Sequence, residues 1–111
     1  MMPWTTTDLY RRGNAASPRL TYVRLGKDVE VFVRGNVNWV QAESGGVSTF
    51  SSPGLGSPWW ILPAGSEYPD ELVVVNDHGN HFSWEPRFEM PLTDFLANLA
   101  TVESAFRKLA D

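Results

Sequence analysis

The chain has 111 residues, of which 42% are hydrophobic and 13% aromatic, so it can bury one core and is not expected to be disordered. Its net charge of −4 excludes the basic surface typical of proteins that bind nucleic acid. The absence of cysteine excludes disulfides, thiolate catalysis and cysteine-ligated metals, and no apolar run is long enough to span a membrane.

The organisation of the chain is simple. Residues 1–111 contain no internal repeat and no linker, so we expect a single domain. The first residues show no charged region followed by an apolar run, which is the pattern of a secretory signal. We therefore expect a cytoplasmic protein whose export, if any, uses a route without a cleavable signal.

The first half of the chain is predicted to consist of β-strands. A short strand or turn is expected at residues 9–12. The clearest strand signal is the alternation of valine with other residues from Val29 to Val33. Because Gly35-Asn36 is a tight-turn pair, residues 29–34 and 37–42 are expected to form an antiparallel hairpin.

Two further strands and a hairpin are predicted in the second half. Residues 51–58, rich in serine, proline and glycine, form a candidate flexible loop before an apolar strand at residues 59–62. Residues 72–75 form another apolar strand. Residues 76–80 form a strong turn signal, so this strand is expected to pair with residues 81–85.

One helix is predicted, over residues 92–109. Pro91 suits a first helical position, and Asp94 near the start with Arg107 and Lys108 near the end complement the helix dipole. The apolar residues recur at spacings of three and four: Leu92, Phe95, Leu96, Leu99, Val102, Phe106 and Leu109. The expected fold is therefore a strand-rich α+β fold with a C-terminal helix covering the sheet.

A candidate ligand-binding segment begins with two glycines. Gly45 and Gly46 allow a ligand to approach the backbone closely, and the hydroxyls of Ser48 and Thr49 can then position it. A plain turn that enters a strand is the alternative interpretation. Ser48 as a hydrolase nucleophile, with His81 as its base, is a weaker hypothesis because the segment is not Gly-x-Ser-x-Gly.

A second candidate segment is the strand that begins at His81. His81, Ser83 and Glu85 share one face of this strand, whereas Phe82 and Trp84 share the opposite face and belong to the core. The polar face points either to solvent or into a cleft. In a cleft, His81 can donate a hydrogen bond, act as a base or orient a ligand.

The remaining candidate site residues are an arginine and a second histidine. Arg11 follows Leu9-Tyr10 and can hold a phosphate with two hydrogen bonds, although a surface arginine at a strand end is the common alternative. His78 is interpreted as a turn residue. Because two histidines at this spacing match no common zinc pattern, we expect no metal site.

Taken in order, these segments resemble a known toxin family. Leu9-Tyr10-Arg11, Gly45-Gly46-Val47-Ser48 and His81-Phe82 are similar to the ADP-ribosyltransferase-like toxins that type VI secretion systems deliver. The resemblance spans residues 9–96. It also includes the passages Leu62-Pro63-Ala64-Gly65, Pro69-Asp70-Glu71-Leu72 and Glu85-Pro86 with Met90-Pro91.

The resemblance implies a fold, a cofactor and a site. The fold would be a split antiparallel β-sheet with few helices that binds NAD, the substrate, in a cleft. Arg11 would contact the phosphate or ribose, and Tyr10 or a tryptophan would stack on the nicotinamide. Ser48 with Thr49, behind Gly46, would shape the nicotinamide pocket, and His81 would occupy the third catalytic position.

The resemblance also implies a biological role. Such toxins arrest bacterial growth in the target-cell cytoplasm, and a small immunity protein blocks them in the producing cell. We identify no Glu-x-Glu or Gln-x-Glu pair of the kind that orients the ribose and activates an acceptor in many transferases. Transfer to a macromolecule, NAD hydrolysis and an unusual acceptor therefore all stay open.

Two other functions remain possible on the residues alone. One is a toxin that keeps the fold but acts by binding a target without chemistry. The other is a ligand-binding β-rich domain in which Trp39, Trp59 and Trp60 form an aromatic platform for a sugar or a base. Growth arrest that depends on Arg11 or His81 would separate the enzyme from the ligand-binding domain.

Overall fold

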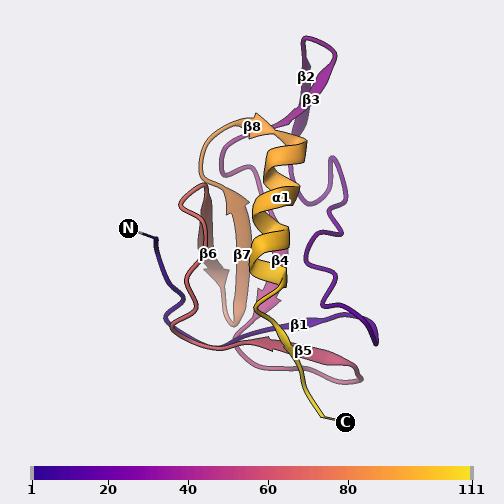
Figure 1. The fold of residues 1–111 in the computed structure, drawn as a ribbon, viewed down its shortest axis with the longest axis vertical. Coiled ribbons are helices and arrows are strands. Elements are labelled where there is room, and N and C mark those ends of the chain that lie inside the picture. The colour runs from indigo at the N-terminus through magenta and orange to yellow at the C-terminus, as the bar shows by residue number, and fades with distance from the viewer. Residues whose placement is uncertain (1, 111) are drawn as a thin grey trace.

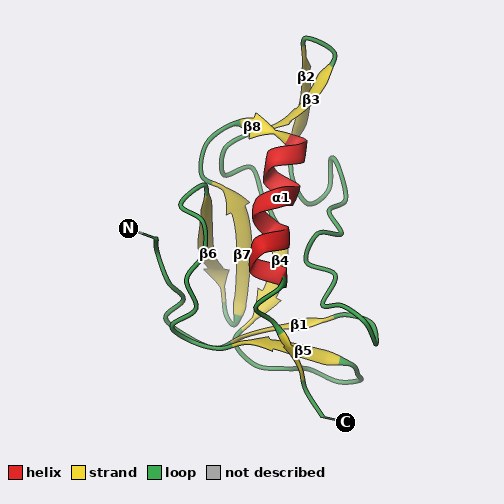
Figure 2. Ribbon diagram, viewed as in Figure 1, coloured by secondary structure: helices red, strands yellow, loops and turns green. Residues whose placement is uncertain are grey.

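The computed structural model describes residues 2–110 and has the predicted α+β fold, with one helix and mostly antiparallel strands in two sheets (Figure 1, Figure 2). The elements are β1 (Leu9–Arg12), β2 (Val31–Arg34), β3 (Val37–Val40), β4 (Val47–Phe50), β5 (Trp59–Leu62), β6 (Leu72–His78), β7 (His81–Pro86), β8 (Met90–Pro91), α1 (Leu92–Glu103) and β9 (Arg107–Lys108). No helix in this part of the chain is long and apolar enough to cross a bilayer.

The larger sheet has six strands in the order β6-β7-β4-β1-β5-β9. β4 pairs with β7 over four residues but with β1 only at Tyr10 and Phe50. In Figure 1, β1 and β5 accordingly run across the direction of β4, β6 and β7. This short contact between β1 and β4 divides the sheet into two parts that meet beside Phe50.

The smaller sheet contains the predicted hairpin. β2 and β3 pair from Val31–Val40 to Arg34–Val37, and β8 adds to β3. The expected hairpin is therefore confirmed, with strands somewhat shorter than 29–34 and 37–42. Figure 1 shows it projecting from one end of the molecule.

The helix is shorter than predicted. α1 ends at Glu103 with Ser104 as its C-cap, and Arg107 and Lys108 lie in β9, which pairs with β5. The spacing of apolar residues predicted a longer helix because Phe106 is buried as it would be in a helix. Phe106 nevertheless lies beyond the end of α1. Pro91 lies in β8, one residue before the first helical residue.

One buried apolar cluster joins the helix to both sheets. Trp84 in β7 lies at its centre, with no exposed surface, and its ring packs edge-on against Tyr68 at 5.0 Å. Phe95, Leu99 and Val102 contribute the buried face of α1. The core therefore fixes β7, the strand that carries His81, and β7 in turn fixes β4.

The hairpin of β6 and β7 differs in one respect from its prediction. β6 continues to His78, so the loop contains only Gly79 and Asn80 rather than residues 76–80. The pairing shifts between Asn76 and His78 before the hairpin closes at the pair His78–His81. This irregularity places Asp77 beside both histidines.

Candidate functional site

Three side chains from β4, β6 and β7 form a continuous hydrogen-bonded chain. The Nε2 atom of His81 lies 2.8 Å from the hydroxyl of Ser48, and its Nδ1 atom lies 2.5 Å from Oδ1 of Asp77. The His81 side chain is 16% exposed, whereas that of Asp77 is 41% exposed. The imidazole is therefore held between a hydroxyl and a carboxylate at a partly covered site.

The carboxylate of Asp77 determines how the imidazole is used. The hydrogen bond from His81 lowers the pKa of Asp77, which therefore remains an anion and accepts the Nδ1–H of the ring. A neutral imidazole protonated on Nδ1 presents Nε2 as an acceptor. His81 can then accept the O–H of Ser48, which gives an oriented hydroxyl and a base at one place.

Arg11 contacts the same strand through a different group. Its Nη1 atom donates to the backbone carbonyl of Ser48 at 2.7 Å, while its other nitrogens donate to the carbonyls of Pro18 and Arg19. Burial lowers the pKa of the Arg11 guanidinium. The structure thus joins Arg11 to the backbone of Ser48 rather than to its hydroxyl or to His81, and the nitrogens of Arg11 are occupied by backbone carbonyls.

Strand alternation places the next arginine on the other face. Successive side chains of β1 point to opposite faces, so Arg12 shares a face with Tyr10 and not with Arg11. Tyr10 pairs with Phe50, and Phe50 pairs with His81. Because paired side chains lie on the same face, Arg12 faces the side on which His81 lies.

Aromatic contacts confirm that these residues share a face. The ring of Phe50 lies 5.5 Å from the ring of His81 and 6.3 Å from the ring of Trp59, and Trp59 pairs with Arg12. The guanidinium of Arg12 lies against Gly56 in the loop before β5. Arg12 is exposed, and no hydrogen bond or ion pair engages its guanidinium among residues 2–110.

Two adjoining hollows lie on this face. One, of about 290 Å³, is lined by Phe50, Ser52, Pro53, Gly54, Trp59 and Asn80, and it adjoins His81 through Phe50. The other, of about 360 Å³, shares Pro53, Gly54 and Trp59 with the first. Together they provide a surface walled by Phe50 and Trp59 on the face of His81, although neither Ser48 nor His81 lines them, and their volumes are near the lower end of small-molecule sites.

The remaining predicted site residues lie around β4. Tyr10 lies opposite Phe50 on the face of His81. Thr49 points to the opposite face, where its buried hydroxyl accepts the indole N–H of Trp84 at 3.1 Å and donates to the carbonyl of Phe82 at 2.9 Å. Thr49 therefore holds β4 against the core.

Gly46 is required by packing against β7. A Cβ atom on this residue would lie 1.9 Å from the carbonyl oxygen of Trp84, far closer than two non-bonded heavy atoms can approach. Glycine at this position thus lets β4 approach β7 closely enough for Ser48 to reach His81.

Alanine at Gly46 is expected to lower the free energy of unfolding by about 1–3 kcal/mol, because β4 must move away from β7. A thermal melt measures this loss. Gly54→Ala is the control, since its added methyl meets only the side chain of Trp59, at 3.3 Å, and the two midpoints should differ clearly. Equal melting temperatures of the Gly46→Ala and Gly54→Ala proteins would show that β4 can move away from β7 without loss of stability.

Sequence reasoning missed Asp77 and Arg12. Asp77 was assigned to a turn, and only the pairing shift in β6 brings it to His81. Arg12 could have been found from the alternation along residues 9–12. Ser83 and Glu85 were expected on a polar face, but both are buried.

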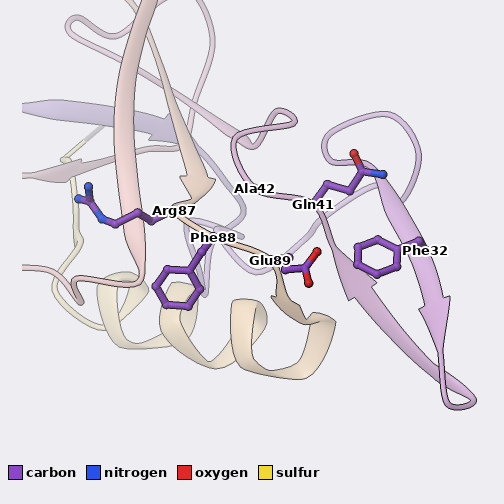
Figure 3. A pocket seen from close by; sticks show the side chains of 6 residues that line it. All are labelled: Phe32, Gln41, Ala42, Arg87, Phe88 and Glu89. Carbon is purple, nitrogen blue, oxygen red and sulfur yellow. The ribbon is translucent and has the colours of Figure 1, made fainter.

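A larger hollow lies elsewhere. It measures about 490 Å³ and is lined by Phe32, Gln41, Ala42, Arg87, Phe88 and Glu89, between the β2–β3 hairpin and the segment after β7 (Figure 3). Gln41 and Glu43 form the only Gln-x-Glu pair of the sequence. Sequence reasoning overlooked this pair. The backbone N–H of Glu43 donates to the carbonyl of Pro86, at the end of β7 opposite to His81, so the pair lies away from Ser48 and His81.

The tryptophans proposed as a platform do not share one surface. Trp39 lies in the smaller sheet, where it stacks on Phe32 and is covered by Arg34. Trp59 and Trp60 are adjacent in β5 and so point to opposite faces. Trp59 alone lines the hollows described above.

Comparison with known protein families identifies the family of this chain. A family model described as "Tse2 ADP-ribosyltransferase toxin" matches residues 15–108, which include Ser48, Asp77 and His81. Arg11 and Arg12 lie just before the matched range. No curated protein and no solved structure shows significant similarity.

Proposed function

The chain belongs to the family of Tse2 ADP-ribosyltransferase toxins, and we propose that it binds NAD over Ser48 and His81 and breaks the bond between nicotinamide and ribose. The observation that carries this proposal is the chain from the Ser48 hydroxyl through His81 to Asp77, beside two hollows with aromatic walls. Membership in a transferase family implies NAD as the substrate.

The chemistry requires positioning more than covalent catalysis. When the glycosidic bond breaks, nicotinamide leaves with the bonding electrons and the ribose carbon becomes oxocarbenium-like. A nucleophile then attacks that carbon and loses a proton, which His81 can accept at Nε2 directly or through Ser48. Water as the nucleophile gives ADP-ribose, whereas a nucleophile on a target gives a modified macromolecule.

The residues divide these tasks between them. Phe50, Tyr10 and Trp59 offer aromatic surfaces for the nicotinamide or adenine ring. Ser48 and His81 hold the ribose, where oriented polar groups lower the barrier most. Arg11 keeps the backbone of Ser48 in position through its hydrogen bond to the carbonyl.

Arg12 is the cation that we assign to the pyrophosphate. It is exposed, has no partner among the described residues and lies against the loop that lines both hollows. A free guanidinium can bind a phosphate with two charge-assisted hydrogen bonds. The sequence predicted that Arg11 makes this phosphate contact. Titration of the two arginine variants with NAD tests that prediction.

Calorimetric titration with NAD should distinguish the two arginines. Arg12→Ala is expected to weaken NAD binding by about tenfold, the loss of one charge-assisted contact of about 1.5 kcal/mol, with an unchanged melting temperature. Arg11→Ala is expected to lower the melting temperature, because three carbonyls lose their donor. Arg107→Ala, in β9, is the matched control.

Three results would contradict the assignment of Arg12 or the proposed function. If Arg12→Ala binds NAD as tightly as the wild type, Arg12 does not contact the pyrophosphate. If the wild type binds no NAD, the proposed function itself fails. A normal melting temperature with lost NAD binding in Arg11→Ala would restore Arg11 as the phosphate contact.

The biological setting that we propose follows from the family. The toxin acts in the cytoplasm of a target cell, reaches it by a secretion system that needs no signal peptide, and is blocked in the producer by an immunity protein. Co-expression with a small protein encoded beside it should restore growth. A toxin that acts by binding alone is the second candidate, favoured by the separate hollow beside Phe32.

A further inference from the structure

The tip of the β6–β7 hairpin gathers three metal-binding groups. The Nδ1 atoms of His78 and His81 lie 3.0 and 2.5 Å from the same Asp77 oxygen, and the ligand atoms of all three residues lie within 4.8 Å of one another. We propose that this cluster binds a divalent transition-metal ion of the Zn²⁺ type, and that the bound ion inhibits the toxin.

Sequence spacing did not predict this cluster. Two histidines and an aspartate within five residues fit no common zinc pattern, but the two-residue loop closes His78 directly opposite His81. Their rings stack at 4.8 Å, and the pairing shift turns Asp77 toward both. The backbone of the hairpin thus assembles the donors.

The donor set determines which cation fits. Two imidazole nitrogens and one carboxylate oxygen suit Zn²⁺ and its neighbours rather than Ca²⁺ or Mg²⁺, which prefer oxygen. Donors of a tetrahedral Zn²⁺ lie about 3.3 Å apart, given bonds of about 2.0 Å, so Asp77 must move by less than about 1 Å from His81. The His78 side chain is 76% exposed and free to adjust, which also opens a path for the ion.

Metal binding and the proposed catalysis require opposite states of His81. In the metal-free site, Nδ1 donates to Asp77 and Nε2 accepts from Ser48. A metal on Nδ1 displaces that proton, so Nε2 must carry the hydrogen and donate to the Ser48 hydroxyl. The ring can then no longer accept a proton, and the orientation of Ser48 is reversed. Inhibition, unlike binding, rests on the proposed function.

Metal binding is tested on untagged protein, since a histidine tag would bind the same ions. Titration with Zn²⁺ by calorimetry, and with Co²⁺ by visible absorption, should give one ion per chain. His78→Ala should weaken binding by at least about tenfold. Asp70→Asn, which removes an exposed carboxylate outside the cluster, should bind as the wild type does. A wild type that binds no Zn²⁺, or a His78→Ala protein that binds it equally, would overturn the proposal.

Inhibition is tested separately by following NAD consumption with and without Zn²⁺. His78 takes no part in the proposed catalysis, so His78→Ala should keep the activity of the wild type but lose its sensitivity to Zn²⁺. Equal inhibition of both proteins would show that Zn²⁺ acts elsewhere. If neither protein consumes NAD, the proposed function fails, while the binding titrations still decide the metal site.

Discussion

Replacing His81 by alanine is expected to abolish growth arrest and to reduce NAD consumption by about 10²–10⁴-fold, the range of a positioned acid or base. The imidazole links Ser48 to Asp77, so its removal leaves the hydroxyl without an acceptor at 2.8 Å. The side chain lies outside the apolar cluster, and the melting temperature should stay near that of the wild type. A growth assay and a melting curve on the same proteins check both parts.

The neighbouring histidine provides the control for this prediction. His78→Ala removes an exposed imidazole from the same hairpin and should leave growth arrest intact. Asp77→Asn should give an intermediate loss, because the amide can no longer hold the Nδ1–H with a full charge. A well-folded His81→Ala protein with full toxicity would show that His81 has no catalytic role.

Replacing Trp84 by alanine is expected to lower the free energy of unfolding by about 3–5 kcal/mol. The ring is fully buried, packs against Tyr68 and donates its indole N–H to Thr49. Its loss leaves a cavity and removes the donor to the Thr49 hydroxyl, which then keeps only its hydrogen bond to the carbonyl of Phe82. Domains of this size have free energies of unfolding of about 5–15 kcal/mol, so a loss of this size should lower toxicity by unfolding part of the protein. Chemical denaturation measures the loss of stability.

An exposed tryptophan serves as the comparison for Trp84. Trp4 is 55% exposed, and Trp4→Ala should cost less than about 1 kcal/mol. Phe95→Ala, in the buried face of α1, should behave like Trp84→Ala. A Trp84→Ala protein that unfolds at the denaturant concentration of the wild type would contradict the assignment of this residue to the core.

The strands were predictable because their signals are local. Alternating valines and the Gly35-Asn36 turn define the hairpin of β2 and β3, and the structure confirms it. The end of α1 was not predictable in this way. Residues 104–109 keep a helical spacing, but pairing with β5 draws Arg107 and Lys108 into a strand, and that partner lies more than 40 residues away in the sequence.

The candidate site was predictable only in part. Ser48 and His81 stand out by residue type, and the pairing of β4 with β7 places them in contact. The position of Asp77 beside His81 depends on a shift in the pairing of β6 with β7, which no local sequence pattern predicts. The different environments of Arg11 and Arg12 also depend on tertiary structure. The carbonyls of residues 18–19 fold back onto Arg11, whereas Arg12 lies against the loop at Gly56.

Release of nicotinamide from NAD by the purified protein tests the central claim most directly. Chromatography with mass detection follows nicotinamide together with ADP-ribose, free or attached to a lysate protein. We expect the wild type to release nicotinamide, His81→Ala to release about 10²–10⁴-fold less, and His78→Ala to match the wild type. A wild type that arrests growth but releases no nicotinamide, with or without a lysate as acceptor, would contradict the account and favour a toxin that acts by binding alone.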